Sequence, residues 1–305
     1  MAARQSPRVS FGLPVRNGEE SIAKCLDSIL AQDFIDFEVV ISDNVSTDRT
    51  CEILKQYAAQ DDRIRVHFNE ENVGLVANFN RVAEIARGTY FRWIGADDWL
   101  EPGYTSACVE ALDRDPDAVL ATTFFGLHHP KGESEFAEYQ GEYPTSDDPV
   151  RRIARLFYFF HAGPEVYEPT YSMMRHSILK ETQLFQLRRH QDWLLAVELG
   201  LLGPFAHIPE CLFHRNWPEV PSTGHYEHLI ELHPELTKVL QPSPWRLMSA
   251  LNRLVARADG LTVLQRLRCN LHILVFCFSR ATRRARAHLR KFRRQRLGLT
   301  REAWR

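Results

Sequence analysis

The sequence predicts an α/β protein with a doubly wound, mostly parallel sheet and a C-terminal helical extension. Three observations lead to this fold class. Residues 8–95 alternate between strand-like and helical patterns of apolar side chains. The run at 37–42 is almost continuously apolar, as in a strand that is covered on both faces of a parallel sheet. The resulting order, with a helix between successive strands, is typical of parallel sheets with right-handed crossovers.

In this first half, strands are expected at 9–15, 37–42, 64–68 and 90–94. Helices are expected between them at 20–32, around 51–58 and at 75–87, and Ser46 or Thr47 is a suitable cap for the second of these helices. Sheets of this kind bind ligands beyond the carboxyl ends of their strands. The loops at 14–17, 43–47 and 95–98 leave those ends, so we expect them to converge on one site.

The second half has a looser pattern. Asp148 followed by Pro149 favours a helix start just ahead of 152–160. Residues 126–149 are polar and rich in Gly, Pro and His, so they are expected to form a loop or a hairpin. The remaining elements are expected as helices at 104–112, 178–184, 192–201, 226–240, 244–257 and 262–296, and as strands at 118–124, 171–175 and 205–208.

Charge is distributed unevenly along the chain. The 305 residues carry a net charge of only -1, but residues 246–305 hold 16 Lys/Arg and 2 Asp/Glu, whereas residues 1–245 hold 22 and 37. An acidic body with a basic end is typical of a chain whose end meets an anionic surface. The six cysteines form no Cys-x-x-Cys pair, which favours reduced thiols in the cytoplasm. We expect neither a signal peptide nor a membrane-spanning helix.

Two adjacent acids, Asp97 and Asp98, follow the strand expected at 90–94. Neighbouring carboxylates repel each other, and a hard divalent cation offsets that repulsion. Mg²⁺ or Mn²⁺ takes carboxylate oxygens and leaves coordination positions open for phosphates. A solvated turn is the alternative, since Asp-Asp pairs are common in loops.

Several motifs in one order carry a resemblance to a known family. They are PVRNGEE (14–20), FEVVISDNVSTD (37–48), NVG (72–74), ARGTYF (86–91) and ADDWLEP (96–102). The chain resembles a family 2 glycosyltransferase, densely over 8–102 and more weakly at 191–192 and 203–215. The resemblance implies a GT-A fold, a nucleotide-diphosphate sugar donor, a divalent cation (Mn²⁺ or Mg²⁺) and transfer with inversion. It also implies a GT-A domain over 1–224, with a nucleotide-sugar half at about 8–102 and an acceptor half at about 103–224, and a helical, basic extension over 225–305.

The resemblance assigns the nucleotide-sugar site to loops that follow the first two strands. Relatives often carry an aromatic residue where this chain has Arg16, whose guanidinium can also stack on a base. Asp43 matches an acid that accepts hydrogen bonds from the base or ribose, although an Asx-turn explains an aspartate here as well. The donor-site residues implied by the resemblance are Pro14, Arg16, Asn17, Glu20, Asp43, Asn44, Asp97 and Arg215.

The same resemblance implies a cation site formed by Asp97, Asp98 and His214. The family motif is Asp-x-Asp, and Gly95 stands at the position of its first acid. A second departure is Trp217, which occupies the position of the histidine in the family's Arg-x-His-Pro pattern. His214 could replace that histidine in space, or it could be a strand-edge histidine without a ligand role. A loop at 218–224 is a candidate lid over the donor.

Asp192 is the general base that the resemblance implies. A weak carboxylate base within hydrogen-bond reach is sufficient late in the transfer step, when the acceptor hydroxyl has become acidic. The alternative is structural, because an acid in the first turn of a helix is stabilised by the helix dipole. The acceptor, either a saccharide or a lipid-linked molecule, is not identified by any motif.

The C-terminal helix expected at 262–296 combines an apolar face with a run of arginines. A basic amphipathic helix can lie on an anionic membrane surface, which would place the protein in the cytoplasm and peripherally on the inner face of a membrane. The alternative is a helix that packs on the domain and ends in a solvated basic segment. No nucleic-acid partner is expected. Two rival functions are a GT-A-like nucleotidyltransferase and a catalytically inactive sugar-nucleotide-binding protein.

Overall fold

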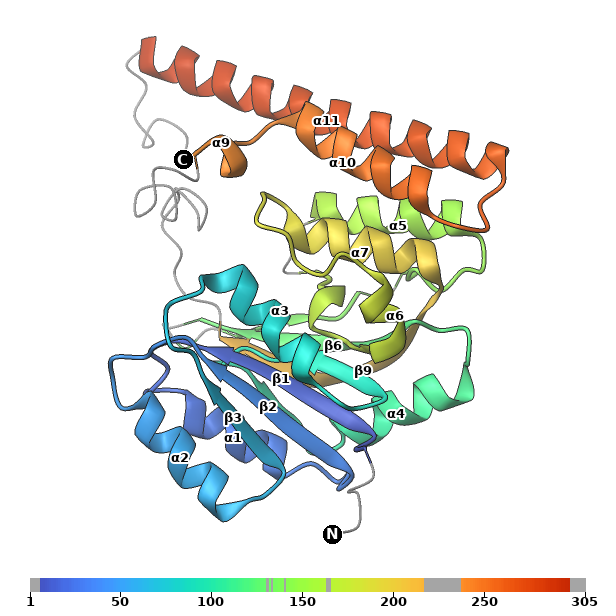
Figure 1. Ribbon diagram of the computed structural model, residues 1–305. Helices are drawn as coiled ribbons and strands as arrows, with labels where there is room; N and C mark the ends of the chain where they lie inside the picture. The colour runs from blue at the N-terminus through green and yellow to red at the C-terminus, as the bar shows by residue number, and fades with distance from the viewer. Residues whose placement is uncertain are drawn as a thin grey trace. The chain divides into compact units, whose positions relative to one another are not determined.

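The computed structural model describes residues 6–129, 132, 134–139, 141–162, 166–216 and 237–296 (Figure 1). Its contacts divide the chain into two compact units, Met1–Leu240 and Gln241–Arg305. The strands are β1 (Val9–Val15), β2 (Phe37–Asp43), β3 (Ile64–Phe68), β4 (Tyr90–Trp93), β5 (Trp99–Leu100), β6 (Leu120–His128), β7 (Ser134–Ala137), β8 (Met173–Arg175) and β9 (Phe205–Asn216). The helices of the first unit are α1 (Ile22–Leu30), α2 (Thr50–Gln60), α3 (Leu75–Ile85), α4 (Tyr104–Arg114), α5 (Pro149–Ala162), the 3-10 turn η1 (Pro169–Tyr171), α6 (His176–Glu181), α7 (Gln191–Leu202) and α9 (Thr237–Leu240).

The strands form one mixed sheet in the order β3-β2-β1-β4-β8-β6-β9-β5, with β7 paired to β6. The first part, β3-β2-β1-β4, is entirely parallel, as the alternating pattern predicts. The second part adds antiparallel pairings of β8 with both β4 and β6, whereas β6 and β9 run parallel. In register, Val15 lies opposite Asp43 and Gly12 lies opposite Trp93, so the carboxyl ends of β1, β2 and β4 reach the same edge.

Helices cover both faces of this sheet (Figure 1). The apolar side chains of α1 and α4 pack on one face, against alternate residues of β1 and β2 such as Phe11 and Val39. On the other face α3 packs on β1 and β2. Gly12 makes this close approach possible, because a Cβ there would lie 2.5 Å from the Phe91 ring and 2.9 Å from Val82 Cγ2. The buried core therefore sits around the parallel strands that carry the predicted site.

The second unit is a pair of helices, α10 (Pro244–Arg257) and α11 (Val263–Arg296), that pack on each other. α10 begins with a Ser243 cap, whose hydroxyl accepts from Arg246 N at 3.3 Å, and Pro244 at its first position. Arg266 of α11 donates to the terminal carbonyls of α10, including that of Ala256 at 2.9 Å. Within the described residues, none of the helices combines the length and the apolar content needed to span a membrane.

Most predicted elements are present with ends shifted by a few residues, but β9 continues to Asn216 where the prediction ended at 208. The predicted cap of α2 is also wrong. α2 is capped neither by Ser46 nor by Thr47, because these two hydroxyls donate to Asp43 and Asn17 instead. Asp48 Oδ1 accepts from Thr50 N at 3.0 Å in their place. The predicted lid at 218–224, Trp217, most of the helix expected at 226–240 and the boundary expected after residue 224 lie outside the described residues.

Candidate active site

The loops that follow β1 and β2 are interlocked by hydrogen bonds. Asn17 has a positive φ of 54°. Its side-chain oxygen accepts from Thr47 N at 2.8 Å, and its backbone N–H donates to Ser46 Oγ at 2.9 Å. Glu19 accepts from Arg49 N at 2.9 Å. The convergence expected for these two loops is therefore present. Arg16 and Glu20 are exposed on them, and Pro14 is buried within β1.

Asp43 and Asn44 lie buried at the end of β2 and support the neighbouring chain. The Asp43 carboxylate accepts from Ser46 N at 3.1 Å, from Ser46 Oγ at 2.5 Å and from Cys51 Sγ at 3.3 Å, so it holds the loop that follows β2. Asn44 donates to Asn72 Oδ1 at 2.7 Å and accepts from Val73 N at 2.9 Å. These contacts fix the NVG loop ahead of α3 against the ends of β1 and β2.

Asp97 and Asp98 lie together beyond β4, in two different environments. Asp97 is exposed, whereas Asp98 is only 2% exposed and its Oδ2 has no hydrogen-bond partner. Burial raises the pKa of the Asp98 carboxyl to about 6, with Arg215 and Arg92 opposing the shift and Asp97 adding to it. A Cβ built on Gly95 would lie 2.9 Å from Asp97 Oδ1 and 2.9 Å from Asp98 Oδ2, so both carboxylates border the space left by this glycine.

Arg215, at the end of β9, is shared between two acids. Its Nε lies 3.7 Å from Asp98 Oδ2, and its Nη1 pairs with Glu168 from the segment ahead of η1. The guanidinium also lies over the ring of Tyr171, 4.5 Å from the centroid. Sequence reasoning missed Glu168 and Tyr171, because neither belongs to a motif.

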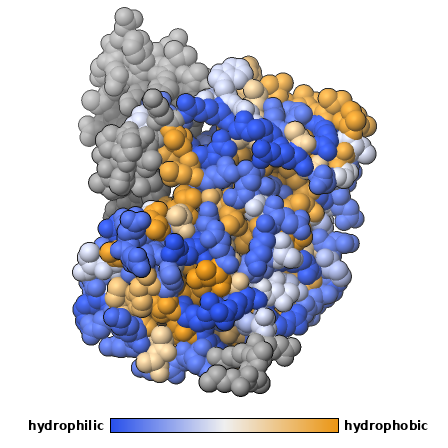
Figure 2. All heavy atoms as spheres, in the orientation of Figure 1, coloured by the Kyte–Doolittle hydropathy of each residue, from blue (hydrophilic) through white to orange (hydrophobic). Residues whose placement is uncertain are grey.

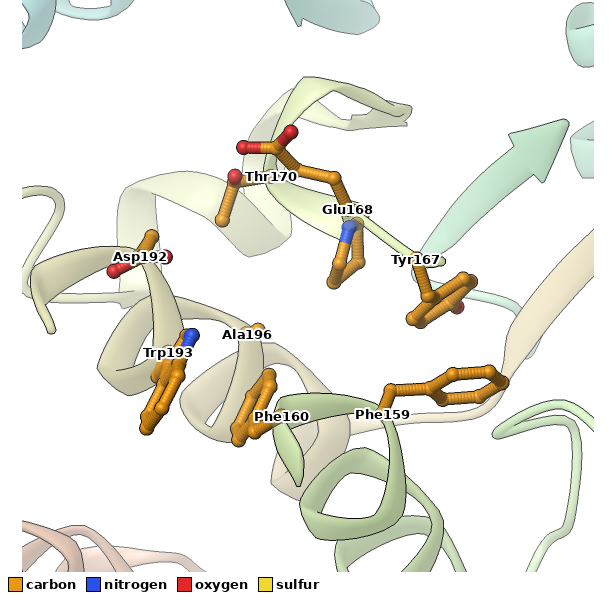
Figure 3. A pocket seen from close by; sticks show the side chains of 9 residues that line it. Phe159, Phe160, Tyr167, Glu168, Thr170, Asp192, Trp193 and Ala196 are labelled. Carbon is orange, nitrogen blue, oxygen red and sulfur yellow. The ribbon is translucent and has the colours of Figure 1, made fainter. Parts of the chain in front are cut away.

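Asp192 lies in the first turn of α7, as expected, and lines a small cavity together with Glu168 and Thr170 (Figure 3). The cavity of about 20 Å³ holds roughly one water. Aromatic side chains line part of this cavity. Two of them, Phe160 and Trp193, stack with ring centroids 4.8 Å apart. Burial, followed by Asp98, Asp97 and Asp192, raises the pKa of the Tyr171 hydroxyl. These three aspartates are therefore near enough to Tyr171 to influence its hydroxyl electrostatically.

His214 does not join this group. Its Nε2 lies 2.9 Å from Glu101 Oε1, its Nδ1 lies 3.0 Å from His128 Nε2, and its ring stacks on Trp99. Successive side chains of a strand point to opposite faces, so His214 and Arg215 cannot both face Asp98. The prediction of His214 as a third cation ligand is therefore not supported by the geometry.

Two observations test whether the remaining residues suit a divalent cation. Asp98 Oδ2 is buried without a hydrogen bond, and only the absence of a side chain at Gly95 leaves room between the oxygens of Asp97 and Asp98, which suits a cation there. Within the described part of the chain, however, no three His, Cys, Asp or Glu side chains come together as a metal site. Two carboxylates fit Mg²⁺ or Mn²⁺ only where phosphate and water complete the coordination.

The chain resembles known proteins in sequence. Residues 10–182 match the family model of glycosyl transferase family 2. The chain is 33% identical to chondroitin synthase of Escherichia coli over 214 residues, which cover 70% of this chain and 29% of the synthase. Across eight curated relatives, the chain spans between 13% and 55% of the relative's length.

Solved structures share the fold. S. aureus TarS in complex with UDP-GlcNAc superposes with a TM-score of 0.66 at 20% identity, covering 89% of this chain and 73% of TarS. The mannosyltransferase PcManGT from Pyrobaculum calidifontis, in complex with GDP-Man and Mn²⁺, gives a TM-score of 0.55 at 17% identity and covers 90% of this chain and 70% of its own. These likenesses confirm the predicted GT-A type of α/β fold with C-terminal helices.

Proposed function

The chain belongs to glycosyltransferase family 2, and from that membership we propose that it transfers a sugar from a nucleotide-diphosphate sugar to an acceptor hydroxyl with inversion. One observation carries the proposal. Arg215 lies 3.7 Å from Asp98, pairs with Glu168 and lies over the ring of Tyr171, while Glu168 lines the same cavity as Asp192. This chain of contacts supports the proposal that Asp97 and Asp98 would act on the diphosphate in the same site where Asp192 would act as the base.

The donor is proposed to lie along the ends of β1 and β2. Asp43 ends β2 at the site edge, and the exposed Arg16 can stack on a base. The support from known proteins is that TarS binds UDP-GlcNAc and that PcManGT binds GDP-Man. The proposed binding site for the nucleoside also includes four further residues, Pro14, Asn17, Glu20 and Asn44.

Asp97 and Asp98 are proposed to hold a divalent cation, Mn²⁺ or Mg²⁺, against the donor diphosphate. When bound there, the ion would neutralise the negative charge that grows on the leaving group. PcManGT was solved with Mn²⁺, which supports the choice of cation. Arg215 lies next to Asp98, and we assign it the role of a second positive group that contacts the diphosphate.

Asp192 is proposed to accept the proton of the acceptor hydroxyl. The hydroxyl attacks the anomeric carbon from the side opposite the leaving diphosphate, so one displacement inverts that centre. A carboxylate can take the proton late in this step, when the oxygen has already bonded to carbon. Asp192 lines the cavity beside Glu168 and Thr170, which supports its assignment to the site.

The acceptor is proposed to be a growing saccharide or a lipid-linked molecule of surface polysaccharide or glycolipid assembly. Chondroitin synthase of Escherichia coli is a relative whose name fits this class of reaction. The proposed location is the cytoplasm, where a lipid-linked acceptor would be reached from the inner face of a membrane.

A two-step measurement tests the proposal. A panel of UDP- and GDP-sugars, each with Mn²⁺, is first compared for thermal stabilisation of the protein. The stabilising donor is then assayed for nucleotide release with and without saccharide acceptors. We expect Asp192→Asn to lower acceptor-dependent release by about 100-fold or more while donor binding stays unchanged. Asp117→Asn, an exposed acid outside the site, serves as the control.

Binding without release by the wild-type protein across the acceptors would instead favour a sugar-nucleotide-binding protein without transferase activity. Gly95 and the lack of a third ligand among the described side chains support this second candidate. Formation of pyrophosphate from a nucleoside triphosphate and a sugar phosphate would identify the nucleotidyltransferase.

A further inference from the structure

Helix α11 has two apolar faces, and only one of them is covered. Cys269, Ile273, Phe276 and Cys277 are buried, on the side of the helix that packs with α10. A second set of side chains lies on the other side and is between 51% and 76% exposed: Val263, Leu264, Leu267, Leu271, Leu274, Val275 and Phe278. We call these seven residues the exposed stripe.

The exposed stripe is continuous. At about 100° per residue its members fall within about 120° of the helix circumference, roughly opposite the covered face. No charged residue interrupts this arc between Val263 and Phe278. Figure 2 shows hydrophobic residues gathered over the first part of α11. Apolar stripes of this length on a helix surface are rare unless something binds them.

The charge of the same helix indicates what that partner is. Residues 280–296 contain nine Arg or Lys and no Asp or Glu, and the helical backbone continues to Arg296. A partner that suits this helix must offer an apolar layer beside a dense array of negative groups. The acidic segment 1–245 would be repelled by such a surface, while the basic segment 246–305 would be attracted to it.

We propose that the exposed stripe of α11 docks on an anionic lipid bilayer. The helix lies in the plane of the interface, the stripe enters the boundary between head groups and acyl chains, and the arginines bind lipid phosphates and carboxylates. Lipids provide both required features in one surface. This docking goes beyond the proposed sugar transfer and does not depend on it.

Vesicle binding by the full-length protein tests the proposal. The probes are phosphatidylcholine vesicles with and without about 30% phosphatidylserine, measured by sedimentation at low and high salt. The stripe variant Leu267→Ser, Leu271→Ser, Phe278→Ser removes exposed apolar side chains only. The matched control Ile35→Ser, Phe136→Ser, Leu187→Ser removes three exposed apolar side chains from the first unit.

We expect wild type and control to bind the phosphatidylserine vesicles, and salt to weaken that binding. The stripe variant should bind at least about 100-fold more weakly, because it loses the apolar area that enters the bilayer. Circular dichroism on each variant confirms that the fold is intact. Equal binding by stripe variant and control overturns the proposal. So does a wild-type protein that ignores the vesicles but forms a dimer that the stripe variant loses, since a second copy would then cover the stripe.

Discussion

Arg215 is shared between Asp98 and Glu168, and its side chain is only 15% exposed. A buried guanidinium needs such partners, because an unpaired charge in the interior is costly. Glu168 therefore orients the guanidinium that faces Asp98. We regard Glu168 as a positioning residue of the site.

Glu168→Gln should destabilise the protein by about 2 kcal/mol, because it removes one of the two acids that pair with the buried guanidinium of Arg215 and leaves Asp98 as the other. Urea unfolding measures this change. Glu142→Gln is the matched control, since Glu142 also pairs with an arginine, at 2.5 Å from Arg155, but is 85% exposed. It should change stability by no more than about 0.5 kcal/mol. An equal loss in both variants would contradict a special role for Glu168.

Gly95→Ala should weaken Mn²⁺ binding by about tenfold, because the new methyl group would lie 2.9 Å from oxygens of both Asp97 and Asp98. Isothermal titration with Mn²⁺ and the stabilising donor measures this effect. Gly103→Ala is the control, since a Cβ there meets nothing within 4 Å. Unchanged Mn²⁺ affinity in Gly95→Ala would show that the pair holds no cation.

Strands β6 and β9 bring together Thr122 and a half-buried histidine, His207. His207 accepts or donates at Nδ1 with Thr122 Oγ1 at 2.9 Å, and its ring stacks on Tyr143 at 3.5 Å between centroids. Burial lowers the pKa of His207 to about 4. His207 is therefore neutral in the folded state.

The pH dependence follows from this pKa. In the unfolded chain a histidine titrates at about 6.5, so the unfolded state binds the proton first. The free energy of unfolding should therefore fall as the pH drops from about 6.5 to about 4. The loss is on the order of 1–2 kcal/mol, because partial exposure lets water screen the cost. Urea unfolding across this pH range should show a shallower loss for His207→Gln than for wild type. Identical slopes would assign the acid sensitivity to other groups.

Several elements could be predicted because their apolar side chains recur at the regular spacing of a strand or a helix. β3 at Ile64–Phe68 and α10 at Pro244–Arg257 have the expected bounds. The order β4-β8-β6-β9-β5 could not be predicted, because an apolar strand does not specify its neighbour. The surroundings of His214 could not be predicted for the same reason. Only the pairing of β5 with β9 shows that its ring stacks on Trp99.

The site itself was predictable where a motif ends a strand, as at Asp43 and Asp97. The contacts of Glu168 and Tyr171 with Arg215 depend instead on where η1 lies in the fold. The sequence could not predict that position, because such a short segment has no regular spacing of apolar residues. Whether Asp192 is a base or a helix-start acid also could not be decided from its position in α7 alone. Its location on the cavity wall next to Glu168 now favours the chemical role.

At the scale of the whole molecule, the described donor-side residues all belong to the unit Met1–Leu240. A chain that ends after Leu240 should therefore fold by itself and bind the stabilising nucleotide sugar within about threefold of the full-length affinity. Circular dichroism melting and titration of the nucleotide sugar check both expectations. Loss of cooperative melting in the shortened chain would mean that α10 and α11 are needed for the fold.

The interlocked loops after β1 and β2 have a consequence for the rate of donor capture. Asn17 and Glu19 hold the turn that contains Ser46 and Arg49 through contacts that need no nucleotide. A nucleoside that binds there as proposed would meet a surface that is already assembled, and little backbone entropy would be lost on its arrival. Association on this side should accordingly proceed in a single fast phase, with any slow rearrangement confined to the part that receives the acceptor.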